Sequence, residues 1–285
     1  MTTAETIAQA LRQAAVKLSG LVQADARLEA EILLAHVLDK PRTYLFAWPE
    51  HRLNESSLKH FQSLVERRLH GEPSAYLTGY REFWSLEIAV TTETLIPRPE
   101  TELLVERALH LIPIKSELSI ADLGTGSGAV SAAIASERPA CRILATDIST
   151  AALAVARQNF SRLGLENIHC ANGRWCAALP TGMRFDLIVC NPPYVATDDP
   201  HLMQDGLPWE PISALISGSD GLQDICDIVA TAADRLLPGG WLLLEHGFDQ
   251  GARVRNMLSA ADYRHCRTFR DLGGRDRVSQ GQTPR

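Results

Sequence analysis

From about residue 100 onward, patterns typical of helices alternate with patterns typical of strands. Strands are expected at 118–123, 141–147, 167–171, 185–190 and 241–246, with a final pair near 264–270 and 276–281. Helices are expected at 100–111, 127–136, 150–163, 221–236 and 249–261. Such alternation predicts an α/β fold, in which a mainly parallel seven-stranded sheet is covered by helices on both faces. In such sheets, ligands bind at the carboxyl ends of the strands.

A glycine-rich turn follows the first of these strands. Residues 120–128 read Ile-Ala-Asp-Leu-Gly-Thr-Gly-Ser-Gly and lead from a strand into a helix. Glycines permit positive φ and remove Cβ atoms, so backbone can approach a ligand closely, and the helix start offers unpaired N–H groups. The spacing differs from the dinucleotide fingerprint G-x-G-x-x-G, which disfavours a nicotinamide cofactor. An ordinary tight β–α connection is the alternative interpretation.

An acidic residue, Asp147, ends the next strand. Its carboxylate could accept hydrogen bonds from both hydroxyls of a ribose. Ser149 or Thr150 can cap the helix that follows, so an acid near a helix N-terminus is the structural alternative for Asp147.

The tetrapeptide Asn191-Pro192-Pro193-Tyr194 follows the apolar strand 185–190. Each proline fixes its own φ, lacks an N–H and keeps the preceding residue extended. The Pro192 carbonyl can therefore remain an acceptor beside the Asn191 side-chain oxygen, and two acceptors match the two N–H donors of a planar NH2 group. Tyr194 offers an aromatic face for a flat, conjugated group. A merely rigid turn is the alternative.

Taken together, these motifs resemble class I S-adenosylmethionine-dependent methyltransferases, which have a Rossmann-like sheet. The tetrapeptide resembles that of enzymes that methylate exocyclic or amide nitrogen. Further segments narrow the resemblance to the protein-glutamine N5-methyltransferases of peptide-chain release factors, and they extend over nearly the whole chain: 72–79, 81–84, 95–102, 199–202, 242–247 and 274–277.

This resemblance implies transfer of a methyl group from S-adenosyl-L-methionine to the glutamine of the Gly-Gly-Gln motif of class I release factors. It implies that the acceptor amide is held by Asn191, Pro192, Pro193 and Tyr194, with Asn191, Pro192 and Tyr194 carrying catalysis. It also implies cofactor contacts by Gly124, Thr125, Gly126, Ser127, Gly128, Asp147, Trp175 and Asn191. The family usually has Asp-Trp where this chain has Arg174-Trp175, so an acidic acceptor for the adenine amino group is missing at position 174.

The length of 285 residues favours one large and one small domain. We expect an N-terminal helical substrate-docking domain at 1–75, a β-hairpin linker at 76–97 and the methyltransferase domain at 98–285. Apolar residues recur at helical spacing in three N-terminal stripes, around Ile7, Leu33 and Phe61, which predicts a small helical bundle. Thr2 and Glu5 are a possible capping box. Residues 195–220 form a long connection, a possible lid or substrate wall.

Composition excludes several other classes. The formal net charge of −6 disfavours sequence-independent wrapping of nucleic acid, so no direct nucleic-acid binding is expected. No apolar run approaches the roughly 18 residues of a membrane span, and the first residues lack a signal pattern, so a cytoplasmic protein is expected. The six cysteines show no C-x-x-C spacing and are interpreted as buried reduced thiols. The nine histidines lack ligand spacing, so no metal is expected.

Two rival interpretations remain. A nucleic-acid methyltransferase acting on adenine N6 or guanine N2 could hold the exocyclic amine of a base with the same tetrapeptide. The other rival is a non-catalytic binding protein on the same scaffold, or a nicotinamide oxidoreductase.

Overall fold

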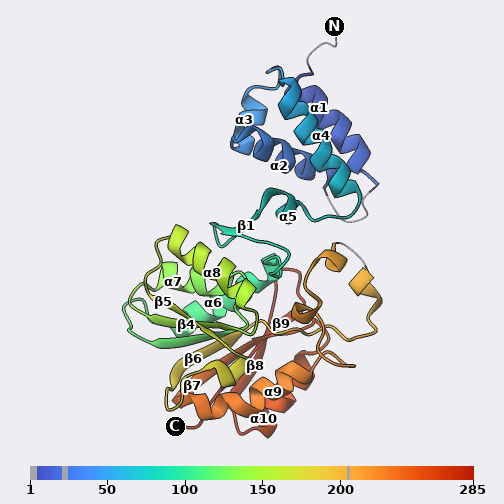
Figure 1. Cartoon of the computed structure of the whole chain (residues 1–285). Coiled ribbons are helices and arrows are strands. Elements are labelled where there is room, and N and C mark those ends of the chain that lie inside the picture. The colour runs from blue at the N-terminus through green and yellow to red at the C-terminus, as the bar shows by residue number, and fades with distance from the viewer. Residues whose placement is uncertain (1–4, 21–24, 204–205) are drawn as a thin grey trace. The chain divides into compact units, whose positions relative to one another are not determined.

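The computed structural model describes residues 5–20, 25–203 and 206–285. They form two compact units, drawn in Figure 1. The smaller unit comprises Met1–Tyr80 and Pro200–Trp209, and the larger comprises Arg81–Asp199 and Glu210–Arg285. The predicted boundaries treat 98–285 as continuous, whereas Pro200–Trp209 belong to the unit of the N-terminal helices.

The smaller unit is built from helices. Its elements are α1 (Ile7–Leu18), α2 (Ala26–Leu38), α3 (Arg42–Ala47), α4 (Glu55–Leu69) and α5 (Ser74–Thr78). The three apolar stripes lie on α1, α2 and α4 and meet in one buried cluster that includes Ile7, Leu33 and Phe61. Burial of these stripes holds the bundle together, since short helices are marginal in isolation.

The first helix starts at a capping box formed by residues other than the predicted ones. The Gln9 backbone N–H donates to the Thr6 hydroxyl, and the Thr6 N–H donates to the Gln9 side chain over 2.9 Å. Thr2, the predicted cap, lies outside the described residues.

A seven-stranded sheet forms the centre of the larger unit as far as it is described, with the order β5-β4-β3-β6-β7-β9-β8. The strands are β3 (Ser119–Leu123), β4 (Arg142–Asp147), β5 (Ile168–Asn172), β6 (Phe185–Cys190), β7 (Leu236–Glu245), β8 (Arg264–Arg270) and β9 (Asp276–Gln282). The first five in spatial order are parallel, and β9 and β8 continue the sheet in antiparallel pairs. Leu123 pairs with Thr146 and with Cys190, so the carboxyl ends of β3, β4 and β6 meet at one edge.

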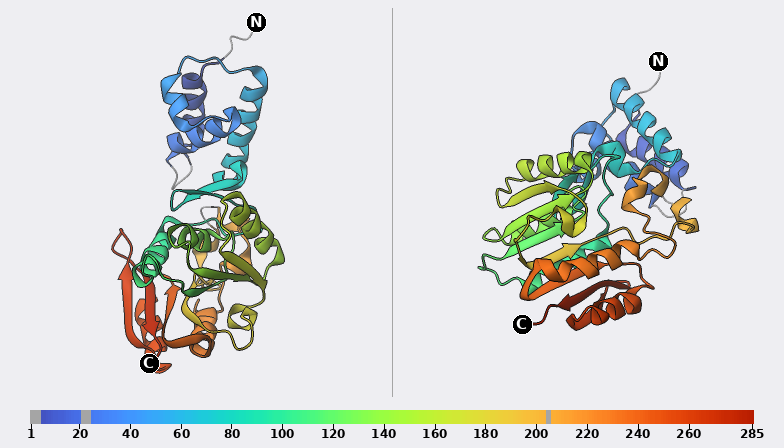
Figure 2. Two further views of the ribbon diagram at one scale, coloured as in Figure 1. Left: turned by 90° about the vertical axis from the view of Figure 1, so that its left-hand side faces the viewer. Right: turned by 60° about the horizontal axis from the view of Figure 1, so that its bottom comes forward.

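Helices cover both faces of this sheet. In Figure 1 and in both views of Figure 2, α6 (Glu102–Leu111), α7 (Ala129–Glu137) and α8 (Thr150–Arg162) lie on one side, and α9 (Gln223–Ala232) and α10 (Gly251–Ala260) on the other. The predicted seven-stranded α/β sheet with helices on both faces is confirmed. A two-stranded sheet of β1 (Tyr80–Phe83) and β2 (Leu86–Ala89) precedes it.

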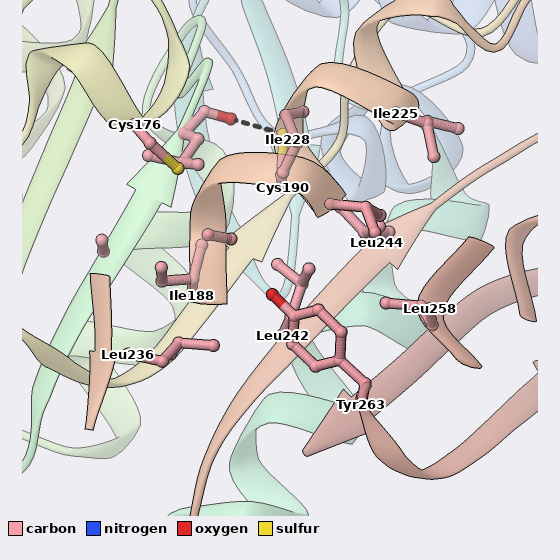
Figure 3. Packing of buried hydrophobic residues seen from close by; sticks show 14 of the residues in the cluster. Cys176, Ile188, Cys190, Ile225, Ile228, Leu236, Leu242, Leu244, Leu258 and Tyr263 are labelled. Atoms are coloured by element: carbon pink, nitrogen blue, oxygen red, sulfur yellow. Dashed lines mark hydrogen bonds between the residues drawn. The ribbon is translucent and has the colours of Figure 1, made fainter. Parts of the chain in front are cut away.

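The core beneath β6 and β7 is shown in Figure 3. Ile188 of β6 and Leu242 of β7 lie there with Ile228 of α9 and Leu258 of α10, all fully buried. The Cys190 thiol at the end of β6 donates to the Leu123 carbonyl over 2.9 Å. This packing fixes the end of β6, from which the tetrapeptide continues.

All six cysteines are free thiols. Cys141, Cys176 and Cys190 are buried, as predicted, Cys170 and Cys266 are only partly buried, and Cys226 is exposed, so the predicted burial is wrong for Cys226. The reason is helical periodicity: Ile225, Ile228 and Val229 turn one face of α9 to the core and leave Cys226 outside.

No helix among the described residues combines the length and apolar character that crossing a membrane requires. Within the same residues, no group of three or more His, Cys, Asp or Glu side chains is arranged to hold a metal ion.

Candidate active site

A cavity of about 410 Å³ lies at the carboxyl ends of β3, β4 and β6, a size typical of small-molecule sites. Its walls contain these predicted site residues: Gly124, Thr125, Gly126, Ser127, Asp147, Trp175, Asn191 and Pro193. Gly128, Pro192 and Tyr194 do not line it. The three motifs, which are far apart in the sequence, therefore contribute to one site.

The glycine turn allows close packing at two points. A Cβ on Gly124, whose φ is +71°, would lie 2.8 Å from the Trp175 ring. Gly128 has a φ of +83°, and a Cβ there would lie 2.6 Å from the Phe160 ring. Only glycine tolerates both the backbone conformation and the contact. Gly124 thus allows the Trp175 ring to pack against the turn at the cavity wall, whereas Gly128 allows α7 to start against α8.

The Asp147 carboxylate is oriented by two backbone amides. Gly126 N–H donates to Oδ2 over 2.9 Å, and Ser149 N–H donates to Oδ1 over 2.8 Å. Ser149 also caps α8 by accepting from Ala152 N–H, so the helix-start interpretation of this segment holds as well. Each carboxylate oxygen has a second lone pair, which remains for a ligand in the cavity.

A residue that was not predicted, Asp122, supports the turn from behind. Its Oδ2 accepts hydrogen bonds from the Thr125 and Ser131 hydroxyls, each over 2.6 Å. Asp122 is buried, and this burial raises the pKa of its carboxyl, while the two hydroxyls oppose the rise. The network fixes the Thr125 side chain at the cavity wall.

The side of the cavity at Trp175 is held by an acid from α9. Asp224 Oδ1 accepts from the Trp175 indole N–H over 3.0 Å and pairs with Arg174 Nη2 at 2.8 Å. Its Oδ2 accepts from the Ser217 hydroxyl over 2.7 Å. Asp224 also lines the cavity. An acidic group is therefore present beside Trp175, although it comes from a position 50 residues after Arg174.

The long connection after the tetrapeptide forms another wall. Pro211, Ser213, Ala214 and Ile216 line the cavity. The predicted role as a lid or substrate wall stays a prediction. The segment contains η3 (Pro200–Met203), η4 (Leu207–Trp209) and η5 (Ile212–Ala214), and its ends pair where Val195 bridges to Ile216.

Glu210 fastens this wall to the segment before α6. The buried Glu210 carboxylate accepts from the Ile96 N–H over 3.0 Å and forms an ion pair with Arg98. Glu210, which directly precedes Pro211, is thereby fixed to the segment before α6. Leu95 and Pro97 of that segment also line the cavity.

The tetrapeptide is supported from two directions. Asn191 Nδ2 donates to the Thr101 hydroxyl over 3.2 Å, and the Tyr194 hydroxyl donates to Glu245 Oε1 over 3.3 Å. The Tyr194 carbonyl accepts from the Gln250 amide over 3.0 Å. The Tyr194 ring packs against the hydrophobic core, and Tyr194 does not line the cavity. Its predicted contact with the acceptor amide stays a prediction.

Sequence reasoning missed Thr101, Asp122, Asp224 and Glu245. Thr101 and Glu245 lie inside two of the resembling segments, which was the available signal. Asp224 carries no such signal, because a helix that begins with an acid is common on any surface.

The described fold is shared with solved methyltransferases. A methyltransferase from Pyrococcus furiosus superposes with a TM-score of 0.55 at 16% identity, over 79% of this chain and 100% of that chain. The T. thermophilus 16S rRNA N2 G1207 methyltransferase, solved with AdoMet and guanosine, gives 0.52 at 19% identity, over 72% of this chain and 49% of that one. At these identities the likeness concerns the fold alone. The sheet and the position of its cavity are those of the class I methyltransferase fold.

Sequence comparison narrows this class. Residues 9–79 match the model of the PrmC N-terminal domain, and residues 99–205 match the methyltransferase small domain. The release factor glutamine methyltransferase of Xylella fastidiosa strain Temecula1 is 52% identical over 258 residues, which cover 90% of this chain and 94% of that protein. The Pseudomonas aeruginosa protein of the same name is 49% identical, over 90% and 92%. The chain belongs to the release factor glutamine methyltransferase family, and it is a protein-glutamine methyltransferase.

Proposed function

We propose that this enzyme transfers a methyl group from S-adenosyl-L-methionine to the side-chain amide nitrogen, N5, of the glutamine in the Gly-Gly-Gln motif of class I peptide-chain release factors. The family supports the release factor as substrate. The cavity supports a small-molecule donor bound beside the tetrapeptide. Translation termination takes place in the cytoplasm, so this substrate places the enzyme there.

The residues present fit this donor. Gly124 lets the Trp175 ring lie directly against the backbone at the cavity wall, Asp147 presents a fixed carboxylate suited to ribose hydroxyls, and Asp224 with Trp175 presents an acceptor and a flat ring suited to adenine. When bound, the donor supplies a methyl group activated by an adjoining sulfonium.

The nitrogen of the acceptor amide is a poor nucleophile, because its lone pair is conjugated with the carbonyl. The protein must therefore orient this nitrogen for attack. The Asn191 amide nitrogen is committed to Thr101, so Oδ1 is the polar atom of this side chain left for a ligand. Within the described residues, the Pro192 carbonyl accepts no hydrogen bond. Two acceptors, Asn191 Oδ1 and the Pro192 carbonyl, would orient the substrate NH2 and favour the positive charge that develops on nitrogen.

A single observation carries this proposal: Asn191 and Asp147 line the same cavity. A group for the acceptor and a group for the donor are thereby brought to one place, as direct transfer requires.

The test uses the purified full chain, a labelled methyl donor and a release factor. Mass spectrometry should find one added methyl group on the glutamine of the Gly-Gly-Gln motif. Asn191→Ala should slow transfer by about 100- to 1000-fold, as loss of one preorganised polar group does elsewhere, while calorimetry shows donor affinity nearly unchanged. The matched control is Asn256→Ala, an exposed position on α10, which should transfer at the normal rate.

The same assay distinguishes the nucleic-acid alternative. Label that appears on RNA or DNA, with the release factor unlabelled, would contradict the proposal and favour methylation of an exocyclic amine of a base.

A further inference from the structure

Two buried polar side chains support the tetrapeptide: Thr101, which also lines the cavity, and Glu245, which has no part in the chemistry proposed above. Thr101 ends η1 (Pro99–Thr101) and is 4% exposed, and Glu245 ends β7 and is fully buried. Each belongs to a segment that resembles the family, 95–102 and 242–247.

These two side chains connect Asn191 with Tyr194. Asn191 Nδ2 donates to Thr101 Oγ1 over 3.2 Å, and the Tyr194 hydroxyl donates to Glu245 Oε1 over 3.3 Å. The Thr101 hydroxyl faces the Glu245 carboxyl and stabilises its charged form. A chain of polar groups thus runs from Asn191 through Thr101 and Glu245 to Tyr194.

The ionised Glu245 carboxylate determines the donor-to-acceptor direction of the hydrogen bonds in this series of polar side chains. An ionised carboxylate only accepts hydrogen bonds, so a hydroxyl that faces it must turn its hydrogen toward it. Thr101 then has only lone pairs left for Asn191, and these bind the NH2 end of the carboxamide. Asn191 Oδ1 is consequently the end turned to the cavity. The reverse orientation would place an NH2 group against the NH2 of the substrate.

We propose that Glu245 is a positioning residue which, through Thr101, sets the Asn191 carboxamide with Oδ1 toward the acceptor nitrogen and, through Tyr194, braces the same tetrapeptide. The functional part of this inference rests on the proposed function. The orientation itself is a property of the enzyme without substrate.

The charge on the Glu245 carboxyl therefore controls the direction of these hydrogen bonds. Burial raises the pKa of its carboxyl to about 7, and nearby Glu100 acts in the same sense, whereas Thr101, Tyr194 and Arg277 lower it. Within the described residues, Oε2 has no hydrogen-bond partner, which limits the stabilisation of the charge. His246, the residue after β7, does not fill this gap, because its Nε2 is hydrogen-bonded to the Ser279 hydroxyl.

A protonated Glu245 carboxyl can itself donate a hydrogen bond. The Thr101 hydroxyl then no longer has to donate to Glu245, and the orientation of the Asn191 carboxamide is no longer fixed. Methyl transfer should therefore rise with pH through about 7, because the ionised form holds Asn191 in the competent orientation. The acidic limb of the pH–rate profile should disappear in Glu245→Gln.

The first experiment needs no substrate. In protein carrying isotope-labelled asparagine, the side-chain NH2 resonance of Asn191 is assigned by its absence from Asn191→Ala and followed by NMR against pH. It should shift with an apparent pKa near 7. The shift should be lost in both Glu245→Gln and Thr101→Val. An Asn191 resonance that ignores pH and both substitutions would overturn the inference.

The second experiment measures methyl transfer. Thr101→Val removes the hydroxyl at nearly constant volume and should lower kcat about tenfold or more, with KM for the donor little changed, whereas Thr101→Ser should retain most of the rate. In the Asn191→Ala background, Thr101→Val should add almost nothing, because it acts through Asn191. Equal losses in both backgrounds would overturn the inference. If the wild type leaves the release factor unmethylated while the resonance responds as described, the proposed function fails and the positioning role stands.

Discussion

The Asp224 carboxylate accepts a hydrogen bond from the Trp175 indole nitrogen over 3.0 Å. The same oxygen pairs with Arg174, the residue that replaces the acid expected next to Trp175. The arginine therefore does not leave this side of the cavity without an acid. It holds in place an acid that comes from α9.

Removal of this acid should weaken donor binding. Asp224→Ala frees the indole, leaves Arg174 without its nearer partner and breaks the contact to Ser217. Hydrogen bonds to charged groups contribute about 1.5–3 kcal/mol, so the Kd for S-adenosylmethionine should rise about tenfold or more. Isothermal titration calorimetry measures this directly.

Asp227 provides the matched control for that measurement. It pairs with Arg174 at 3.4 Å and is 44% exposed. Exposed pairs contribute little, so Asp227→Ala should change the Kd by no more than about twofold. Similar losses from both substitutions would indicate a general effect of charge and refute a specific role of Asp224.

The glycine turn can be tested by adding one carbon. In Gly124→Ala, the new Cβ would lie 2.8 Å from the Trp175 ring, so the ring must move and donor binding should fall at least tenfold. Gly164→Ala is the control, because its φ of +68° imposes similar backbone strain with no atom within 4 Å. It should cost only about 1 kcal/mol of stability and leave the Kd unchanged. Unchanged affinity in Gly124→Ala would refute a role of the Trp175 ring position in donor binding.

Glu210 should control the order of the cavity wall. Glu210→Ala removes the acceptor of the Ile96 amide and the partner of Arg98. Hydrogen exchange measured by mass spectrometry should become faster in peptides covering 211–216, with β3 and β4 unaffected. A wall that stays equally protected would show that the bridge between Val195 and Ile216 suffices to hold it.

The ionised Glu245 carboxylate should lower the free energy of unfolding at neutral pH. The folded protein raises the pKa of this carboxyl from 4.5 to about 7, so between these values it holds a proton that the unfolded chain releases. Stability should therefore fall as pH rises through that window, and Glu245→Gln should remove this loss.

Thermal unfolding checks this expectation. Near pH 8 the variant should melt higher than the wild type, by about 2–4 °C for each kcal/mol of ionisation cost removed, and near pH 5 the two should differ less. A variant destabilised equally at both pH values would show that the carboxylate has a purely structural role.

The five parallel strands could be predicted well because they are short, largely apolar runs bounded by turn residues, unlike the mostly polar β8 and β9. The main error lay at β7, which begins at Leu236 although Pro238, Gly239 and Gly240 follow. These residues weaken strand propensity, but pairing of Leu236 with Phe185 across an irregular register extends the strand. Tertiary pairing prevailed over local preference there.

The clearest local signals of the candidate site came from residues whose backbone conformation is special, whereas Asp147 was found from its place at a strand end and Trp175 from the family resemblance. Glycines and prolines reveal their role locally, which is why the turn at 124–128 and the tetrapeptide were found. The supports of the site join residues far apart: Asn191 and Thr101 are 90 positions apart, and Trp175 and Asp224 are 49 apart. A single sequence contains no sign of such contacts, because each partner alone is an ordinary polar residue.

The central claim is that Asn191 holds the acceptor amide. The most direct measurement is a structure of the enzyme with S-adenosylhomocysteine and a release factor, in which the distance from the glutamine side-chain nitrogen to Asn191 Oδ1 is determined. We expect a hydrogen bond of about 2.7–3.2 Å between these two atoms. A glutamine nitrogen bound elsewhere, or an Asn191 carboxamide with Nδ2 turned toward it, would contradict the account.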